Sequence, residues 1–224
     1  MDLFDNKTKL LGDDLKKSIK PNSKIKIVAS YFSIYAFEAL KDELSKIGEL
    51  QFIFPTPTFV SKGITDKLKK EKREYYIPKH MNENMLYGTD FEIRLRNQLT
   101  QKVIAKECAD WVKNKVTFKS NITPNGIPNF IYVDNGENES VYMPINGFTS
   151  TDLGYEKDNM MFNLINKLDG DYTRQFFNQF KNVWNDDATL EDVTTSITDY
   201  ISSAYIDNAP EYIYFITLYN IFNE

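Results

Sequence analysis

The sequence predicts an α/β fold, with a mixed sheet flanked by helices and then an all-helical extension. Apolar runs at Lys24–Ala29 and Leu50–Phe54 flank a helical pattern, and a strand–helix–strand unit of this length is normally parallel. Two further runs, Phe130–Val133 and Val141–Ile145, are separated by a polar, acidic turn, which is typical of a hairpin. Together these four strands predict a sheet with parallel and antiparallel neighbours.

The first elements are read from helical spacing and from residues that begin or end helices. Residues 5–20 carry a helical pattern with leucines on one side, and Pro21 ends it. Ser33 is the expected N-cap of a helix that continues to about Ile47. Gly48 is expected to end that helix before the next strand.

The remaining elements include one long helix and a series of shorter ones. Residues 55–90 form a long connection that contains a basic run. Asp90 begins a helix that continues to about Lys113, and Val116–Lys119 is a further strand. After Gly154 only helical patterns follow, at Asn159–Leu168, Tyr172–Trp184, Leu190–Tyr205 and Pro210 to the end.

These patterns predict a two-part chain, with an α/β body over residues 1–168 and a helical extension or linker over 169–224. Charge is unevenly distributed, because residues 182–224 contain eight acids and no Lys or Arg, whereas the rest has 27 bases and 24 acids. A single cysteine, Cys108, excludes a disulfide framework. There is no signal peptide and no apolar run of membrane-spanning length, so we expect a cytoplasmic protein without membrane contact.

The hairpin and the turn after it resemble the signature of the phospholipase D-like superfamily. That signature is His-x-Lys, four residues, Asp, then Gly-Ser-x-Asn and Phe-Thr-x-x-Gly-Leu. In this alignment the His and Lys correspond to Ile127 and Asn129, whereas the Asp is retained as Asp134. Gly147 replaces the Asn, and Thr149 matches. The other aligned positions are Pro144 and Ile145, which replace Gly and Ser, and Phe148, Leu153 and Gly154, which match.

In this family the His is the nucleophile, and the Lys, Ser and Asn hold the phosphate charge. The resemblance therefore implies a degenerate site, because isoleucine has no lone pair and asparagine has no charge. It implies no catalytic residue, no metal ligand and no cofactor in this chain. The degenerate motif positions are Ile127, Asn129, Asp134, Gly147 and Thr149.

Four segments resemble more narrowly the amino-terminal region of bacterial Swi/Snf-type (superfamily two) helicases. They are Phe-Asp-Asn-Lys-Thr near the start, Ala-Ser-Tyr-Phe-Ser, Ala-Lys-Glu-Cys-Ala-Asp-Trp and the closing Pro-Glu-Tyr-Ile-Tyr-Phe-Ile-Thr-Leu-Tyr-Asn-Ile-Phe-Asn-Glu. In those proteins a phospholipase D-like domain precedes an ATP-driven motor. The resemblance implies a non-catalytic module that binds DNA or a partner and regulates a motor domain in cis. No glycine of this sequence lies in a Gly-x4-Gly-Lys-Ser/Thr phosphate loop.

The candidate nucleic-acid contacts are basic and aromatic side chains of the long connection and the long helix. From Lys67 to Lys119 there are 13 bases and 7 acids, which is a pattern that suits a phosphate backbone. An equally acceptable interpretation is a solvated helix face. The candidates are Lys67, Lys69, Lys70, Lys72, Arg73, Tyr75, Arg94 and Arg96.

Two other functions stay open at this point. One is a dimeric phosphodiesterase or nuclease with a relocated site at His80, which is the single histidine of the chain. No lysine follows His80 at the spacing that the family uses. The other is a stand-alone protein-interaction domain without a nucleic-acid role. Whether two copies of the chain pair also stays open, since one chain holds one copy of the motif.

Overall fold

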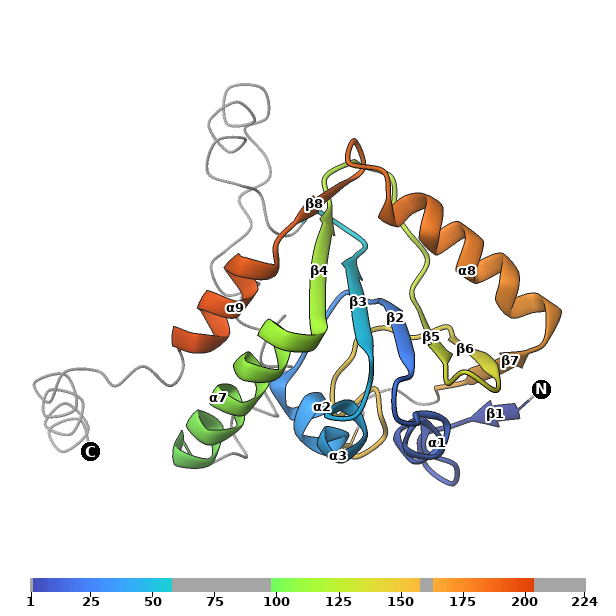
Figure 1. Cartoon of the computed structure of the whole chain (residues 1–224). Coiled ribbons are helices and arrows are strands. Elements are labelled where there is room, and N and C mark those ends of the chain that lie inside the picture. Colours follow the sequence, from blue (N-terminus) through green and yellow to red (C-terminus); the bar gives the residue numbers. More distant parts are fainter. Residues whose placement is uncertain (1, 58–97, 158–162, 204–224) are drawn as a thin grey trace, which may run out of the picture.

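In the computed structural model a single mixed sheet of eight strands runs through the molecule (Figure 1). The structure describes residues 2–57, 98–157 and 163–203. The strands lie in the order β1-β7-β6-β5-β2-β3-β4-β8. Their bounds are β1 (Asp2–Phe4), β2 (Lys24–Val28), β3 (Glu49–Phe54), β4 (Val116–Asn121), β5 (Phe130–Asp134), β6 (Glu139–Met143), β7 (Ile165–Asp169) and β8 (Leu190–Asp192).

The centre of the sheet is parallel, as the sequence predicts. β2 pairs with β3 in parallel, with Ile25 opposite Leu50, and β3 pairs with β4 in parallel, with Phe52 opposite Phe118. Side chains of β2 and β3 are buried on both faces of the sheet, because Ile25 and Phe52 belong to one core cluster and Val28 and Ile53 to the other. The carboxyl ends of all three strands therefore lie at one end of the sheet.

The two flanks of the sheet are antiparallel. β5 pairs with the free edge of β2 and then with β6, so the predicted hairpin is confirmed. β7 and then β1 continue the sheet on this side, and β8 pairs with β4 on the other. The hairpin turn is stabilised by Asp134, whose Oδ1 accepts a hydrogen bond of 2.8 Å from the Gly136 amide, while Gly136 has a φ of +83°.

Helices cover both faces of the sheet. One core cluster joins one sheet face to α1, α2, α3, α7 and α9, and a second cluster joins the opposite face to α8 (Figure 1). The described helices are α1 (Leu11–Ser18), α2 (Ile34–Ala39), α3 (Lys41–Leu44), α7 (Gln98–Lys115), α8 (Asp171–Trp184) and α9 (Thr194–Ser203).

A cluster of phenylalanines in contact with one another accounts for part of the high aromatic content. The Phe118 ring lies 5.2 Å from Phe52 and 5.1 Å from Phe32, and Phe32 stacks on Phe148 at 6.1 Å between centroids. All four side chains are almost fully buried. Phe148 belongs to the sequence signature discussed above, and its role in the fold is to fill this core.

The expectation that only helices follow Gly154 is wrong. Residues 165–169, expected to lie in a helix, form strand β7, because β6 and β1 provide backbone partners on both of its edges. Residues 190–192, also expected to be helical, form strand β8 on the edge of β4. The helix that follows begins at Thr194, and α8 was predicted to within one residue. Residues 165–203 therefore belong to the same sheet and its covering helices.

Two helices of the first half are also shorter than expected. The helical pattern over residues 5–20 produces only α1, because Asp5 turns the chain before it: Asp5 Oδ1 accepts hydrogen bonds from the amides of Lys7, Thr8 and Lys9. The helix expected from Ser33 to Ile47 is divided at Leu40 into α2 and α3. Ser33 is the N-cap as predicted, and its Oγ accepts a hydrogen bond of 3.1 Å from the Tyr35 amide.

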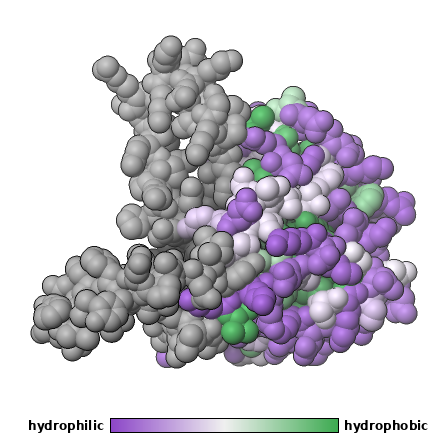
Figure 2. Space-filling view, turned by 60° about the vertical axis from the view of Figure 1, so that its left-hand side comes forward, coloured by the Kyte–Doolittle hydropathy of each residue, from purple (hydrophilic) through white to green (hydrophobic). Residues whose placement is uncertain are grey.

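One face of the described residues is largely polar. Figure 2 shows that hydrophilic side chains dominate the visible described surface and that apolar areas are small and separate. Among the described residues, no helix combines the length and the hydropathy that crossing a bilayer requires.

Candidate functional site

All the aligned motif positions except Asp134 lie near the point where the parallel strand β2 ends. In open α/β sheets, ligands commonly bind outside the carboxyl ends of the parallel strands. Ser30 lies two residues after β2, Asn129 lies one residue before β5, and Asn146 lies three residues after β6. The Asn129 Nδ2 donates hydrogen bonds to the Asn146 carbonyl at 3.1 Å and to Ser30 Oγ at 3.4 Å. Three segments that are distant in sequence are joined by this one amide.

The segment around Gly147 is fixed along the connection between β2 and α2. The Ser30 amide donates to the Asn146 carbonyl at 3.1 Å, and the Phe148 amide donates to the Tyr31 carbonyl at 2.8 Å. The Ser33 amide then donates to the Phe148 carbonyl at 3.0 Å. This ladder extends the sheet beyond its strands and gives the site a rigid backbone. We call residues 29–33, 127–129 and 146–152 the motif end.

The motif end contains neither the nucleophile nor the cation of the family chemistry. Ile127, at the position of the family His, is half-buried and packs against the cluster beneath α8. Asn129, at the position of the Lys, is neutral and already bonded to Asn146 and Ser30. Neither Ile127 nor Asn129 is able to attack phosphorus or to offset the charge of a pentacoordinate transition state.

The Gly147 position has no room for the side chain that the family carries there. A Cβ on Gly147 would stand 2.7 Å from Asp152 Oδ2 and 3.0 Å from Tyr31 Cβ. The Asp152 carboxylate is held in place, since Thr149 Oγ1 donates to its Oδ2 at 2.6 Å. The buried Thr149 hydroxyl also accepts from the Asp152 amide at 3.1 Å. Thr149 is therefore used to build a turn, and Asp152 occupies the space of the missing side chain.

The turn of the motif end is anchored to the start of the chain. Asn6 Nδ2 donates to the Asp152 carbonyl at 2.7 Å, and Asn6 Oδ1 accepts from the Leu11 amide at 2.9 Å. Asn6 adopts a φ of +52° to do this. Gly154, with a φ of +87°, would place a Cβ 3.0 Å from Asn6 Oδ1. The Asp-Asn pair at the start of the chain thus has a structural role.

Asp134 lies away from the other motif positions. It ends β5, whereas Asn129 precedes the same strand, and a five-residue strand spans about 17 Å. Its pairing partners across the sheet are Lys24 and Glu139. Asp134 is therefore a hairpin-turn residue, and it has no contact with the motif end.

The candidate nucleic-acid contacts lie outside the described residues. This holds for His80 as well, so its proposed relocated site is not tested by the structure. Within the described residues, no three His, Cys, Asp or Glu side chains are arranged to hold a metal ion. The nucleic-acid candidates concerned are Lys67, Lys69, Lys70, Lys72, Arg73, Tyr75, Arg94 and Arg96.

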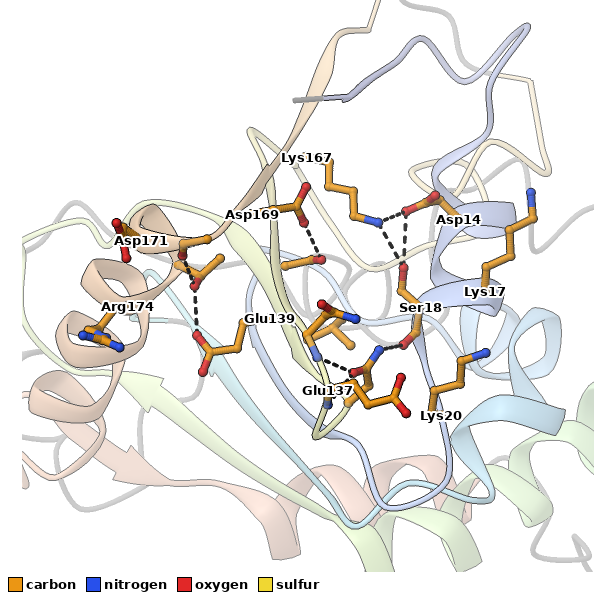
Figure 3. Close-up of a pocket in the computed structure, with 16 residues that line it drawn as sticks. Asp14, Lys17, Ser18, Lys20, Glu137, Glu139, Lys167, Asp169, Asp171 and Arg174 are labelled. Carbon is orange, nitrogen blue, oxygen red and sulfur yellow. Dashed lines mark hydrogen bonds and ion pairs between the residues drawn. The ribbon is translucent and has the colours of Figure 1, made fainter.

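A cavity that the sequence did not predict lies at the opposite end of the sheet (Figure 3). It has a volume of about 720 Å³ and is bounded by α1, the β5–β6 turn, β7 and the first turn of α8. We call it the hairpin cavity. Nearly all of its lining residues are of polar types, and its charged side chains are Asp14, Lys17, Lys20, Glu137, Glu139, Lys167, Asp169, Asp171 and Arg174. They come from segments scattered along the chain, so no local motif marks them.

The floor of the hairpin cavity is a closed hydrogen-bond network. Lys167 Nζ donates to Asp14 Oδ2 at 2.9 Å, and Tyr142 donates its hydroxyl proton to the same oxygen at 2.7 Å. Ser18 Oγ lies 2.8 Å from the Tyr142 oxygen and 3.3 Å from Lys167 Nζ. Burial raises the pKa of Tyr142, and the neighbouring Asp14 carboxylate acts in the same direction. Tyr142 is thereby kept as a neutral donor.

One lysine is buried under α8. Lys26 is 6% exposed, its Nζ donates to Gln51 Oε1 at 2.9 Å, and it lies 5.5 Å from the Phe177 ring centroid and 5.4 Å from that of Phe180. Burial lowers the pKa of Lys26, because removal of water disfavours the charged form. The spacing Lys-Ile-Lys-Ile-Val in β2 placed Lys26 on the sheet face opposite Ile25, but sequence alone did not indicate that this face is covered there.

No protein-family model matches this chain, and no curated protein is similar enough in sequence to be counted as a relative.

Proposed function

We propose that this chain is a non-catalytic phospholipase D-like module that binds DNA or a partner protein and so targets or regulates a helicase motor. The observation that carries the proposal is the arrangement of Asn129. It stands at the position of the catalytic lysine, yet its amide is used to bond Ser30 to Asn146. Function depends on the side chains of a site rather than on the fold, so a site whose reacting groups are replaced by structural ones is assigned a binding role in this proposal.

The steric arrangement around Gly147 supports the non-catalytic part of the proposal. The Asp152 carboxylate fills the space next to Gly147 and is fixed by Thr149, so the departure from the family pattern involves several side chains. Restoring one residue would leave the others in conflict. The mixed sheet with three central parallel strands is compatible with the proposed family and does not by itself distinguish it from other α/β folds.

The DNA-binding part rests on charge in the sequence. Residues Lys67–Lys119 contain 13 bases and 7 acids, and clustered bases of this kind attract a phosphate backbone. A protein partner would use contacts of another kind, and it remains the alternative target of the same module. The described residues of the motif end add no cation to this charge.

The proposal is tested by two assays on the full chain. We expect no cleavage of DNA, RNA or bis-p-nitrophenyl phosphate, with or without added divalent metal, and salt-sensitive binding of DNA. Cleavage that disappears in the His80→Ala variant would overturn the non-catalytic part and favour the relocated site. Absence of DNA binding at low salt, with the fold intact by circular dichroism, would leave partner binding as the function of the module.

A further inference from the structure

The hairpin cavity offers groups that the fold itself does not use. Its floor is self-sufficient: Lys167 donates to Asp14 and Ser18, Ser18 donates to the Tyr142 oxygen, and Tyr142 donates to Asp14. Each of these four contacts has its own proton, so all four hydrogen bonds can form together. This network holds α1 against β6 and β7, so a guest has to be recognised by other side chains of the lining.

Two carboxylates beside this floor retain acceptor capacity. Asp169 Oδ1 accepts one hydrogen bond of 2.7 Å from Ser140 Oγ. Glu139 Oε2 lies 2.8 Å from Thr173 Oγ1, but the same hydroxyl lies 2.6 Å from the Gly170 carbonyl. A hydroxyl has a single proton, so Thr173 serves only one of these acceptors at a time. Both carboxylates are positioned by buried hydroxyl groups, and an ionised carboxylate accepts several further hydrogen bonds.

Two ammonium groups on the α1 side of the cavity are likewise unused. The side chains of Lys17 and Lys20 make no hydrogen bond or ion pair with any described residue. Figure 3 shows both lysines on one side of the cavity, with Asp169 and Glu139 between them and the α8 residue Arg174. Lys17 and Lys20 thus form a cationic zone at and just after the end of α1, and Glu139 and Asp169 form an anionic zone on β6 and β7, whereas Lys167 and Asp14 are paired with each other.

A guest of one charge sign is poorly matched to this division. An anion attracted by Lys17 and Lys20 is repelled by Glu139 and Asp169, and a simple cation meets the opposite problem. A guest that carries both charges next to one another matches both zones. A guanidinium suits the two carboxylates particularly well, because its five N–H donors spread in a planar fork. The volume of about 720 Å³ lies within the usual range of ligand sites and exceeds the size of one amino acid.

We infer that the hairpin cavity binds a peptide segment with adjacent basic and acidic side chains, the basic one on Glu139 and Asp169 and the acidic one on Lys17 and Lys20. The partner is therefore a protein with an exposed mixed-charge segment. This site lies at the opposite end of the sheet from the motif end. The inference does not depend on the proposed function of the motif end or on DNA binding.

The test uses the full chain and four probes at low ionic strength, where charge contacts are least screened. The probes are the acetylated and amidated tetrapeptide Gly-Arg-Glu-Gly, its two half-charged forms Gly-Arg-Gln-Gly and Gly-Gln-Glu-Gly, and free L-arginine. Amide NMR titrations report affinity and location together. We expect the mixed peptide to shift the amides of residues 17–20, 135–140 and 169–174, and to bind about five-fold or more tightly than either half-charged form. Free L-arginine that binds as tightly as the mixed peptide would support the same chemistry with a small-molecule guest.

Two variants test which zone binds which charge of the peptide, and a third is the control. Glu139→Gln should weaken the two arginine peptides and leave the glutamate-only peptide unaffected, whereas Lys20→Gln should do the reverse. Lys113→Gln, an exposed residue of α7, is the control and should change nothing. Unshifted amides distant from the cavity verify that each variant is folded. Equal affinities for the three peptides, equal effects of both cavity variants on all of them, or no shift at these amides would overturn the inference.

Discussion

A Cβ on Gly147 would stand 2.7 Å from the Oδ2 of Asp152, a carboxylate oxygen that Thr149 already holds by a hydrogen bond of 2.6 Å. Tyr31 blocks the other side, with its Cβ at 3.0 Å. The absence of a side chain at residue 147 is thus matched by two neighbours that fill its space.

This relationship predicts that an asparagine at residue 147, as in the family pattern, destabilises the fold. Gly147→Asn should lower the free energy of unfolding by about 1–3 kcal/mol, which is typical of overpacking in a well-packed region. It should not generate phosphodiesterase activity, because Ile127 and Asn129 still lack the reacting groups. Urea denaturation measures the first effect. Gly126→Asn is the matched control, since nothing lies within 4 Å of a Cβ there. Equal midpoints of the two variants would contradict the prediction.

The buried Lys26 predicts a rise in stability with pH on the alkaline side. Burial places its folded pKa below the ordinary value of 10.5. Between the two pKa values the unfolded chain binds more protons than the folded one, so the free energy of unfolding increases as pH rises through this window. Lys26→Met should remove that contribution and raise stability near neutral pH by about 1 kcal/mol or more.

The control for this prediction is Lys24→Met, two residues earlier on the same strand and exposed to solvent. Urea unfolding at a series of pH values from neutral to alkaline separates the two variants. The Lys24 variant should keep the slope of the unchanged protein, and the Lys26 variant should show a flatter one. A slope that is the same in all three proteins would show that Lys26 does not titrate in this window.

Asn6 predicts a stability effect with two separable parts. Asn6→Gly keeps a residue that tolerates the φ of +52° but loses the hydrogen bonds to Asp152 and Leu11. It should cost about 2 kcal/mol, the combined value of two partly buried hydrogen bonds. Asn6→Ala loses the same bonds and adds left-handed strain of about 1 kcal/mol. Thermal unfolding of the two variants should therefore rank them, with alanine the lower.

The acidic end of the chain predicts a modest effect on DNA affinity. Neutralising its last acids by Asp207→Asn, Glu211→Gln and Glu224→Gln should strengthen binding, because fewer carboxylates then oppose the phosphate backbone. Charge reversal of Lys69, Lys70 and Arg73 should weaken binding for all sequences alike, since phosphate contacts carry no base information. Fluorescence anisotropy with single- and double-stranded DNA at several salt concentrations measures both. A salt slope that is unchanged by the reversal would place the contacts elsewhere.

Substitution is preferable to truncation in this experiment. β8 pairs with β4, and α9 contacts α7 and β4, so removal of residues 182–224 would take away a strand and a helix of the described fold. A loss of DNA binding in such a truncation would report unfolding.

The sequence predicted the centre of the fold well and its edges poorly. β2, β3 and the two strands of the β5–β6 hairpin are short segments rich in apolar and β-branched or aromatic residues, and their pattern identifies them without tertiary information. The segment Asn159–Leu168, which contains most of β7, has a pattern that predicts a helix. The strand conformation of β7 is decided by β6 and β1, which are distant in sequence. β1 and β8 have three residues each, which is too short for any periodicity to appear.

The candidate site was likewise predicted only in part from the sequence. The motif positions were found because they follow one another along the hairpin, and the structure brings Asn129 and Gly147 to one end of the sheet. Asp134, on the same strand, was grouped with them by sequence order, although a whole strand separates it from Asn129. The hairpin cavity was missed, because Asp14, Glu139 and Lys167 become neighbours only through the sheet.

The pairing of β1 with β7 has a consequence for biosynthesis. Asp2 lies opposite Lys167, so β1 has no pairing partner until 165 further residues have been translated. Contacts of such long range are slow to form and are completed late. Until then, the backbone of β1 lacks its native partner and is open to unintended strand pairing.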